Sequence, residues 1–196
     1  MEKITFKSDL FIGENALDRL CEFKNEKIFI IADRFITNLG IIEAIITRIT
    51  EHNTFFVFND ISPKPQIEHI IASIAALNEF DGTMLLAIGS CAAIDTAKGV
   101  KFFGQKCGTL KAMPFVVIPT ADGNTSEAAS LSVVEKQTET LKYPVVTDAI
   151  LPDETILDTA LIQMIFPKVE TEQWNVPHQI TAYSAKNGNQ YSKAFG

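Results

Sequence analysis

A series of short apolar runs along the first 120 residues constrains the fold more than any other feature. After an opening strand expected at residues 4–12, such runs occupy residues 27–32, 54–58, 83–88 and 115–118. Each run is too short for a buried helix and is apolar on both faces, which is typical of a strand covered on both sides. Segments with helical periodicity lie between the runs, at residues 14–23, 41–49, 66–77 and 92–103. The alternation predicts an α/β fold, a doubly wound, Rossmann-like parallel sheet with right-handed crossovers.

The pattern changes after residue 120. Two short β-rich segments, 130–135 and 143–146, flank a polar turn and predict a β-hairpin. From residue 175 the chain is polar and weakly periodic, and the helix expected at 178–185 is short. We therefore expect an α/β domain over residues 1–160 and a short, irregular C-terminal tail over residues 161–196.

Composition restricts the class of partner. The net charge of −7 and the pI near 5.0 leave no basic excess of the kind that nucleic acid or an anionic membrane attracts. The three cysteines are odd in number and lack CxxC spacing, which argues against a disulfide scaffold and a zinc knuckle. Charges near the N-terminus stand where a signal peptide would be apolar, and no apolar run reaches the length of a membrane span. These features predict a soluble, cytoplasmic protein with small soluble partners.

A turn of small residues follows the run at 83–88. It reads Gly89-Ser90-Cys91-Ala92 and leads into the expected helix. In open parallel sheets ligands bind at the carboxyl ends of the strands where the winding reverses, and a helix N-terminus there can hold a phosphate. Such a turn is also how any strand–helix unit packs tightly, so the spacing leaves both interpretations open. A nucleophile at Ser90 or Cys91 is a third interpretation, but Gly-x-Ser-x-Gly and a candidate base histidine are missing.

Four motifs in a fixed order favour the interpretation of this turn as a phosphate site. They are the turn with Asp95 and Ala97-Lys98, Ile118-Pro119-Thr120 ending in Ser126-Glu127, Lys142-Tyr143-Pro144, and Leu151-Pro152-Asp153 leading to Leu157-Asp158. The set resembles the iron-containing (group III) alcohol dehydrogenases, in particular the 1-propanol and ethanol dehydrogenases of bacterial microcompartments. The resemblance implies a dinucleotide-binding domain over residues 1–160 and the truncated start of a helical metal-binding domain over residues 161–196.

The resemblance also implies a cofactor site. Asp33 follows the second strand, where the family has an aspartate that binds the adenosine ribose and favours NAD over NADP; a strand-end cap is the alternative. Gly89 matches the first glycine of the turn that holds the pyrophosphate. Ser90, Cys91 and Ala92 replace the two glycines and the serine that follow it. We expect their Cβ atoms to hinder the approach of a phosphate and to penalise a positive φ, which would weaken cofactor binding.

Further matches lie downstream of the turn. Asp95 and Lys98 match two helix residues of the family, although their spacing would equally suit a surface ion pair. Thr120 matches the first threonine of the family's Ile-Pro-Thr-Thr, whereas Ala121 has lost the second hydroxyl. Lys142 matches the lysine that reaches the nicotinamide ribose in the family.

The metal site departs most from the family pattern. His178 matches the first metal-binding histidine, but Trp174 stands four residues earlier, where the family has a ligand aspartate. The two later histidines of the family have no counterpart, and His52 and His69 suit surface or packing roles. A single ligand cannot hold divalent iron or zinc with useful affinity, since a catalytic site needs about three protein ligands.

Two functions follow as expectations. The resemblance implies an oxidoreductase that binds NAD or NADP and a small alcohol or aldehyde, here with weak or no catalysis. The alternative is a non-catalytic nucleotide-binding or protein-interaction module, including self-association through apolar surface that a missing domain would leave uncovered.

Overall fold

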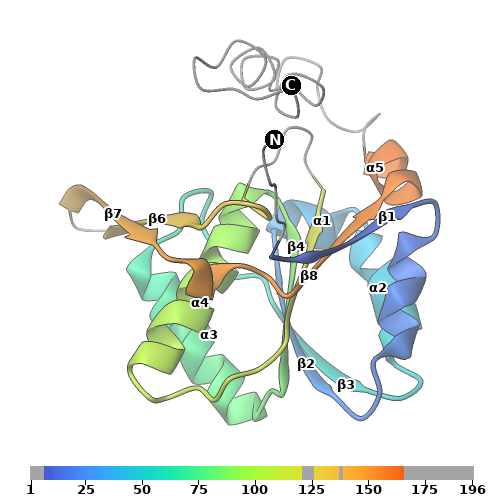
Figure 1. Ribbon diagram of the computed structural model, residues 1–196, viewed down its shortest axis with the longest axis horizontal. Coiled ribbons are helices and arrows are strands. Elements are labelled where there is room, and N and C mark those ends of the chain that lie inside the picture. The colour runs from blue at the N-terminus through green and yellow to red at the C-terminus, as the bar shows by residue number, and fades with distance from the viewer. Residues whose placement is uncertain (1–6, 121–125, 137–138, 166–196) are drawn as a thin grey trace, which may run out of the picture.

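The computed structural model describes residues 7–120, 126–136 and 139–165, which form a layered α/β structure (Figure 1). In chain order the elements are β1 (Asp9–Gly13), η1 (Ala16–Glu22), β2 (Lys27–Ala32), α1 (Arg34–Asn38), α2 (Ile41–Ile49), β3 (Thr54–Phe58), α3 (Ile67–Phe80), β4 (Met84–Gly89), α4 (Cys91–Lys106), β5 (Phe115–Pro119), β6 (Leu131–Lys136), β7 (Glu139–Val146), η2 (Asp148–Ile150), β8 (Glu154–Asp158) and α5 (Thr159–Ile165). Six parallel strands form one sheet in the order β1-β8-β5-β4-β2-β3, and β6 and β7 form a separate antiparallel hairpin. The predicted fold class is confirmed.

Helices cover both faces of the six-stranded sheet. The helix α2 with η1 lies on one face, and α3 with α4 lies on the other (Figure 1). In β2, Ile28 and Ile30 belong to the core under α2, whereas Phe29 and Ile31 belong to the core under α3 and α4. Because successive side chains of a strand point to opposite faces, a sheet covered on both sides requires the uninterrupted apolar runs seen in the sequence.

The direction of winding reverses between β2 and β4. From β2 the chain crosses through α1 and α2 to β3, then returns through α3 to β4, which pairs with the opposite side of β2. It then continues away from β3, through α4, to β5. The crossovers diverge on either side of β2 and β4, so the carboxyl ends of these two strands mark the switch point where open α/β sheets bind ligands.

The hairpin packs against α3 and α4 and takes no part in the main sheet. Ser132 and Val134 of β6 are buried, whereas Leu131 is exposed. The backbone N–H of Glu135 donates to the carbonyl of Pro65 at 2.8 Å, which ties the hairpin to the segment before α3. The hairpin is thus an appendage fixed to two helices.

Several elements differ from the sequence prediction. Residues 16–22 form a 3-10 helix in place of the α-helix expected at 14–23, and the short helices α1 and α5 were not predicted. Strand β8 was also missed, although it pairs with both β1 and β5. The helix expected at 178–185 lies outside the described residues. Among the described helices, none has the length and apolar character needed to cross a membrane.

Candidate functional site

The turn between β4 and α4 contains a glycine that no other residue could replace without strain. Gly89 has a φ of +138°, a region that residues with a Cβ rarely adopt. A Cβ there would collide with the carboxylate of Asp33 and would lie 3.2 Å from the Cβ of Ala93. The first glycine of the family's turn is therefore retained where the backbone requires it.

Asp33, at the end of β2, makes direct contact with this turn. Its Oδ2 accepts a hydrogen bond from the backbone N–H of Ser90 at 2.6 Å. Although Asp33 is the N-cap residue of α1, its side chain makes no capping hydrogen bond in that helix. The carboxylate thus serves the turn between β4 and α4, and it lies at the switch point of the sheet.

The prediction of a positive-φ penalty at residues 90–92 was wrong. Ser90 is extended, with φ −75° and ψ −179°, and Cys91 and Ala92 form the start of α4. Only Gly89 needs a positive φ in this turn, so side chains at the next three positions carry no such penalty. The Oγ of Ser90 accepts from the N–H of Ala92 at 3.3 Å. Side chains of Asp33 and Ser90 therefore occupy two N–H groups that the turn could otherwise offer a phosphate.

Thr120 lies beside the same turn. Gly89 pairs with Pro119 in the sheet, and the N–H of Thr120 donates to the carbonyl of Gly89 at 3.1 Å. Thr120 is buried. The structure thus brings together Asp33, Gly89, Ser90 and Thr120, whereas Ala121 lies outside the described residues.

Asp95 and Lys98 do not form the surface pair that their spacing allowed. The side chain of Lys98 is 0% exposed, and its Nζ lies 3.8 Å from Oδ1 of Asp95. The Nζ also donates to the carbonyls of Ala129 at 2.7 Å and Leu131 at 3.1 Å. Burial lowers the pKa of Lys98 and raises the pKa of Asp95, and their mutual attraction opposes both shifts. The pair faces the segment that leads into β6.

Lys142 lies on the hairpin, outside the six-stranded sheet. It pairs with Glu135 across the two strands, and its Nζ is 3.7 Å from Oε1 of that residue. Its side chain is well exposed. The predicted role of Lys142 at the nicotinamide ribose stays a prediction.

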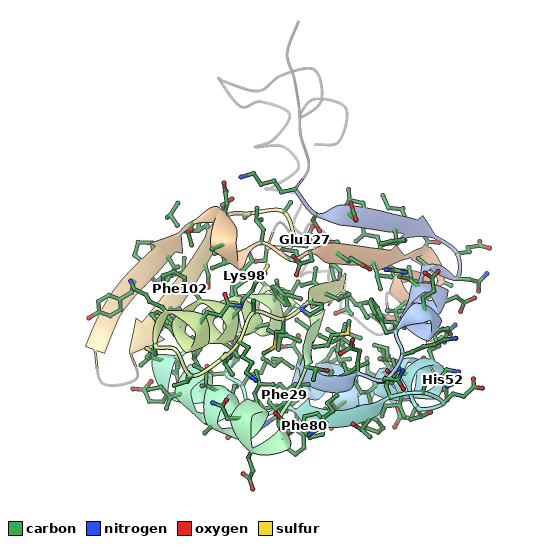
Figure 2. The ribbon with its side chains drawn as sticks, turned by 60° about the horizontal axis from the view of Figure 1, so that its bottom comes forward. Phe29, His52, Phe80, Lys98, Phe102 and Glu127 are labelled. Atoms are coloured by element: carbon green, nitrogen blue, oxygen red, sulfur yellow. The ribbon has the colours of Figure 1, made fainter. Side chains whose placement is uncertain are left out.

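The described residues do not bring together a metal site. No group of three His, Cys, Asp or Glu side chains that could hold a metal ion occurs within residues 7–120, 126–136 and 139–165. His52 is exposed beside Glu51, on the opposite side of the molecule from Lys98 (Figure 2), and His69 is half-buried on α3. His178 and Trp174 lie outside the described residues.

Two residues near the site were not predicted as candidates from the sequence, although one of them, Glu127, stands in a quoted motif. Arg34 follows Asp33 directly, and its guanidinium lies 2.6 Å from the carboxylate of Asp60, after β3. Its position beside a strand-end aspartate was the available signal. Glu127 is the second candidate: burial raises the pKa of its carboxyl, and Lys98 is near enough to oppose this shift.

The switch point, the positive-φ glycine and the strand-end aspartate define the class, a Rossmann-like α/β domain of the kind that binds nucleotides. The chain belongs to the iron-containing alcohol dehydrogenase family, whose family profile matches residues 7–159.

Curated relatives agree with this assignment. The 1-propanol dehydrogenase PduQ of Citrobacter freundii is 28% identical over 99% of this chain and 53% of its own length. The NAD-dependent methanol dehydrogenase of Bacillus methanolicus is 25% identical over 90% of this chain and 50% of its own length. The chain therefore spans about half the length of these relatives.

Solved structures share the fold. An iron-containing alcohol dehydrogenase from Thermococcus thioreducens superposes with a TM-score of 0.80 at 25% identity, over 98% of this chain and 56% of its own. A sulfoacetaldehyde reductase from Bifidobacterium kashiwanohense in complex with NAD+ has a TM-score of 0.70 at 21% identity, over 93% of this chain and 50% of its own.

Proposed function

We propose that this chain supplies the NAD-binding part of an oxidoreductase that interconverts alcohols and aldehydes. The observation that carries the proposal is the contact between Asp33 and the N–H of Ser90 beside Gly89 at the switch point. It fixes a carboxylate at the carboxyl end of β2, where an adenosine ribose can bind, beside the N-terminus of a sixteen-residue helix whose dipole attracts a phosphate.

The same contact supports a preference for NAD over NADP. A carboxylate at the end of the second strand accepts hydrogen bonds from the hydroxyls of an adenosine ribose and repels a phosphate on the 2′ oxygen. Arg34, which could attract such a phosphate, is paired with Asp60. Both features disfavour NADP.

The residues around the turn would hold and orient the dinucleotide. Gly89 lets the turn form against Asp33, the N-terminus of α4 directs the positive end of a helix dipole at a pyrophosphate, and Thr120 lies beside the turn at the end of β5. When bound, the nicotinamide ring exchanges a hydride with the substrate carbon. Within residues 7–120, 126–136 and 139–165, no three His, Cys, Asp or Glu side chains are grouped to hold a metal ion.

We propose in addition that the 196-residue chain by itself has weak or no alcohol turnover. Weak turnover would describe a poor oxidoreductase, whereas no turnover would describe the alternative, a nucleotide-binding module without catalysis. The two differ in the rate of NAD reduction with 1-propanol, compared with a chain in which Gly89 is replaced by alanine.

Titration of NADH, followed by nicotinamide fluorescence, tests the binding proposal. We expect saturable binding that Gly89→Ala removes, because the alanine Cβ collides with Asp33. Gly13→Ala is the matched control: Gly13 has a nearly identical φ of +139°, but nothing lies within 4 Å of the added Cβ. It should cost similar backbone strain, about 1–2 kcal/mol, and leave NADH affinity unchanged. No binding of NADH at millimolar concentration by the unaltered chain would refute the proposal.

A further inference from the structure

Lys98 is a fully buried lysine whose contacts are directed at one stretch of backbone. It lies on α4, and its Nζ donates to the carbonyls of Ala129 and Leu131. Lysine is almost never fully buried unless it is paired, because desolvation of the amine is costly. A methionine would fill similar space at no such cost, so the amine at this position points to a requirement for its hydrogen bonds.

Two acidic side chains lie near Lys98, at the junction between α4 and the segment that leads to β6. Asp95 lies one helical turn before it on α4, and Glu127 lies on the segment that leads to β6 (Figure 2). One carboxylate oxygen of each, Oδ1 of Asp95 and Oε2 of Glu127, is buried with no hydrogen-bond partner among the described residues. Removal of the Lys98 amine would take away a donor from two carbonyls and an opposite charge from two partly buried carboxyls.

These contacts fasten residues 126–132 to α4. Besides the two bonds from Lys98, the Oγ of Ser132 donates to the backbone carbonyl of Asp95 at 3.1 Å. The helix that receives this segment also begins at the glycine turn. The start of the β5–β6 connection is held there as well, since the N–H of Thr120 donates to the carbonyl of Gly89. Lys98 therefore helps to fix the position of residues 126–132 relative to the turn at Gly89.

The order of the strands indicates that this junction lies near the nicotinamide half of a bound dinucleotide. Asp33 follows β2, Gly89 ends β4, and Thr120 follows β5, and these three strands are adjacent in that order. A dinucleotide with its adenosine at Asp33 and its pyrophosphate at Gly89 extends toward Thr120 and the segment fastened by Lys98. We infer that Lys98 is a positioning residue for the nicotinamide half of the cofactor, acting through residues 126–131 and without touching the cofactor. This inference rests on the proposed function.

A second lysine on α4 provides a matched control. Lys101 is also buried, at 11% side-chain exposure, and its Nζ donates to the carbonyl of Leu151 at 2.9 Å. It fastens the segment before β8, which is not the junction with residues 126–131. Lys98→Met and Lys101→Met therefore each remove one hydrogen-bonded amine from the same helix, and both should lower the melting temperature, Lys98→Met by more because its amine is more deeply buried.

The test compares NADH with AMP, which carries only the adenosine half, by calorimetric titration into the 196-residue chain. We expect Lys98→Met to weaken NADH binding about tenfold and AMP binding less than about threefold, because a displaced segment misaligns only the second nucleotide. Lys101→Met should leave both affinities unchanged. Hydrogen exchange in the unliganded chain should accelerate at residues 126–135 in Lys98→Met but not in Lys101→Met.

Equal weakening of NADH and AMP by Lys98→Met, or no weakening of either, would overturn the inference. If Lys98→Met does not fold, Ser132→Ala tests the same junction by removing one bond, and an unchanged ratio of NADH to AMP affinity would then count against it. An unaltered chain that binds neither ligand overturns the proposed function instead, and the exchange measurement still decides whether Lys98 fastens the segment.

Discussion

The carboxylate of Asp33 accepts a hydrogen bond from the backbone N–H of Ser90, 57 residues later in the chain. This contact joins the end of β2 to the start of α4 across the switch point of the sheet. It also explains why residue 89 has no side chain, since a Cβ there would collide with the Asp33 carboxylate.

The preference for NADH over NADPH should depend on the ion pair between Arg34 and Asp60. Replacement Asp60→Asn removes the carboxylate that holds this guanidinium, so Arg34 becomes available to a 2′-phosphate. We expect the dissociation constant for NADPH to fall about threefold to tenfold, with NADH nearly unaffected. Competitive titration of the two cofactors measures this. In Asp60→Asn/Arg34→Met the gain should vanish, and a gain that persists there would show that Arg34 is not its source.

The hydroxyl of Ser90 should compete with a bound phosphate. Ser90→Gly removes the group that occupies the N–H of Ala92, and residue 90 does not require a side chain for its extended conformation. We expect NADH affinity to rise about threefold while stability falls by only about 0.3 kcal/mol, because glycine is itself a favourable N-cap residue. Fluorescence titration and urea denaturation give the two values. Weaker NADH binding in Ser90→Gly would indicate that the hydroxyl itself contacts the cofactor.

Glu127 should make stability depend on pH in an unusual direction. Burial raises the pKa of its carboxyl above the ordinary value of 4.5, so the folded chain holds this proton more tightly than the unfolded chain. The stabilising contribution is complete below pH 4.5 and is lost as pH rises through the folded pKa. Relative to the unaltered chain, Glu127→Gln should therefore gain stability as pH increases from 4.5 toward neutrality, measured by urea denaturation.

Asp148 offers a control of opposite sign. Its pKa lies below the ordinary value of 3.8, chiefly because Lys7 donates a hydrogen bond to it. Its contribution is present above pH 3.8 and is lost as pH falls through the lower folded pKa. Asp148→Asn should thus lose stability relative to the unaltered chain as pH rises. Parallel pH curves for Glu127→Gln and Asp148→Asn would contradict both assignments.

Asp158 should contribute strongly to the stability of the domain at the carboxyl end of β8. It is buried at the end of β8 and accepts hydrogen bonds from the N–H groups of Leu17 at 3.0 Å and Leu161 at 2.9 Å. Asp158→Ala leaves both donors buried without a partner, at a cost of about 2–4 kcal/mol in the free energy of unfolding. Asp60→Ala, which removes an exposed ion pair with Arg34, should change it by less than about 1 kcal/mol. Similar losses in both variants would refute the special role of Asp158.

Sequence periodicity predicted most of the helices and strands, but it missed one strand of the main sheet. The runs at 27–32 and 54–58 coincide with β2 and β3, because both segments are apolar and β-rich, although only β2 is buried along nearly its whole length while β3 lies at the edge of the sheet. Strand β8 was missed because Glu154 and Asp158 interrupt its apolar character. Their charges are satisfied only in the fold, where Glu154 is bound by Arg19 and Asp158 by two backbone N–H groups.

By itself, the sequence determined the parallel α/β architecture, the hairpin and the family, since these depend on local periodicity and on the order of motifs. The tertiary structure decided which residues meet: Asp33 with Ser90, Arg34 with Asp60, and Lys98 with the carbonyls of Ala129 and Leu131. It also decided that the side chains at residues 90–92 carry no positive-φ penalty. The physical reason is that such contacts depend on strand order and on where each crossover returns, and these are set by packing between segments far apart in the chain.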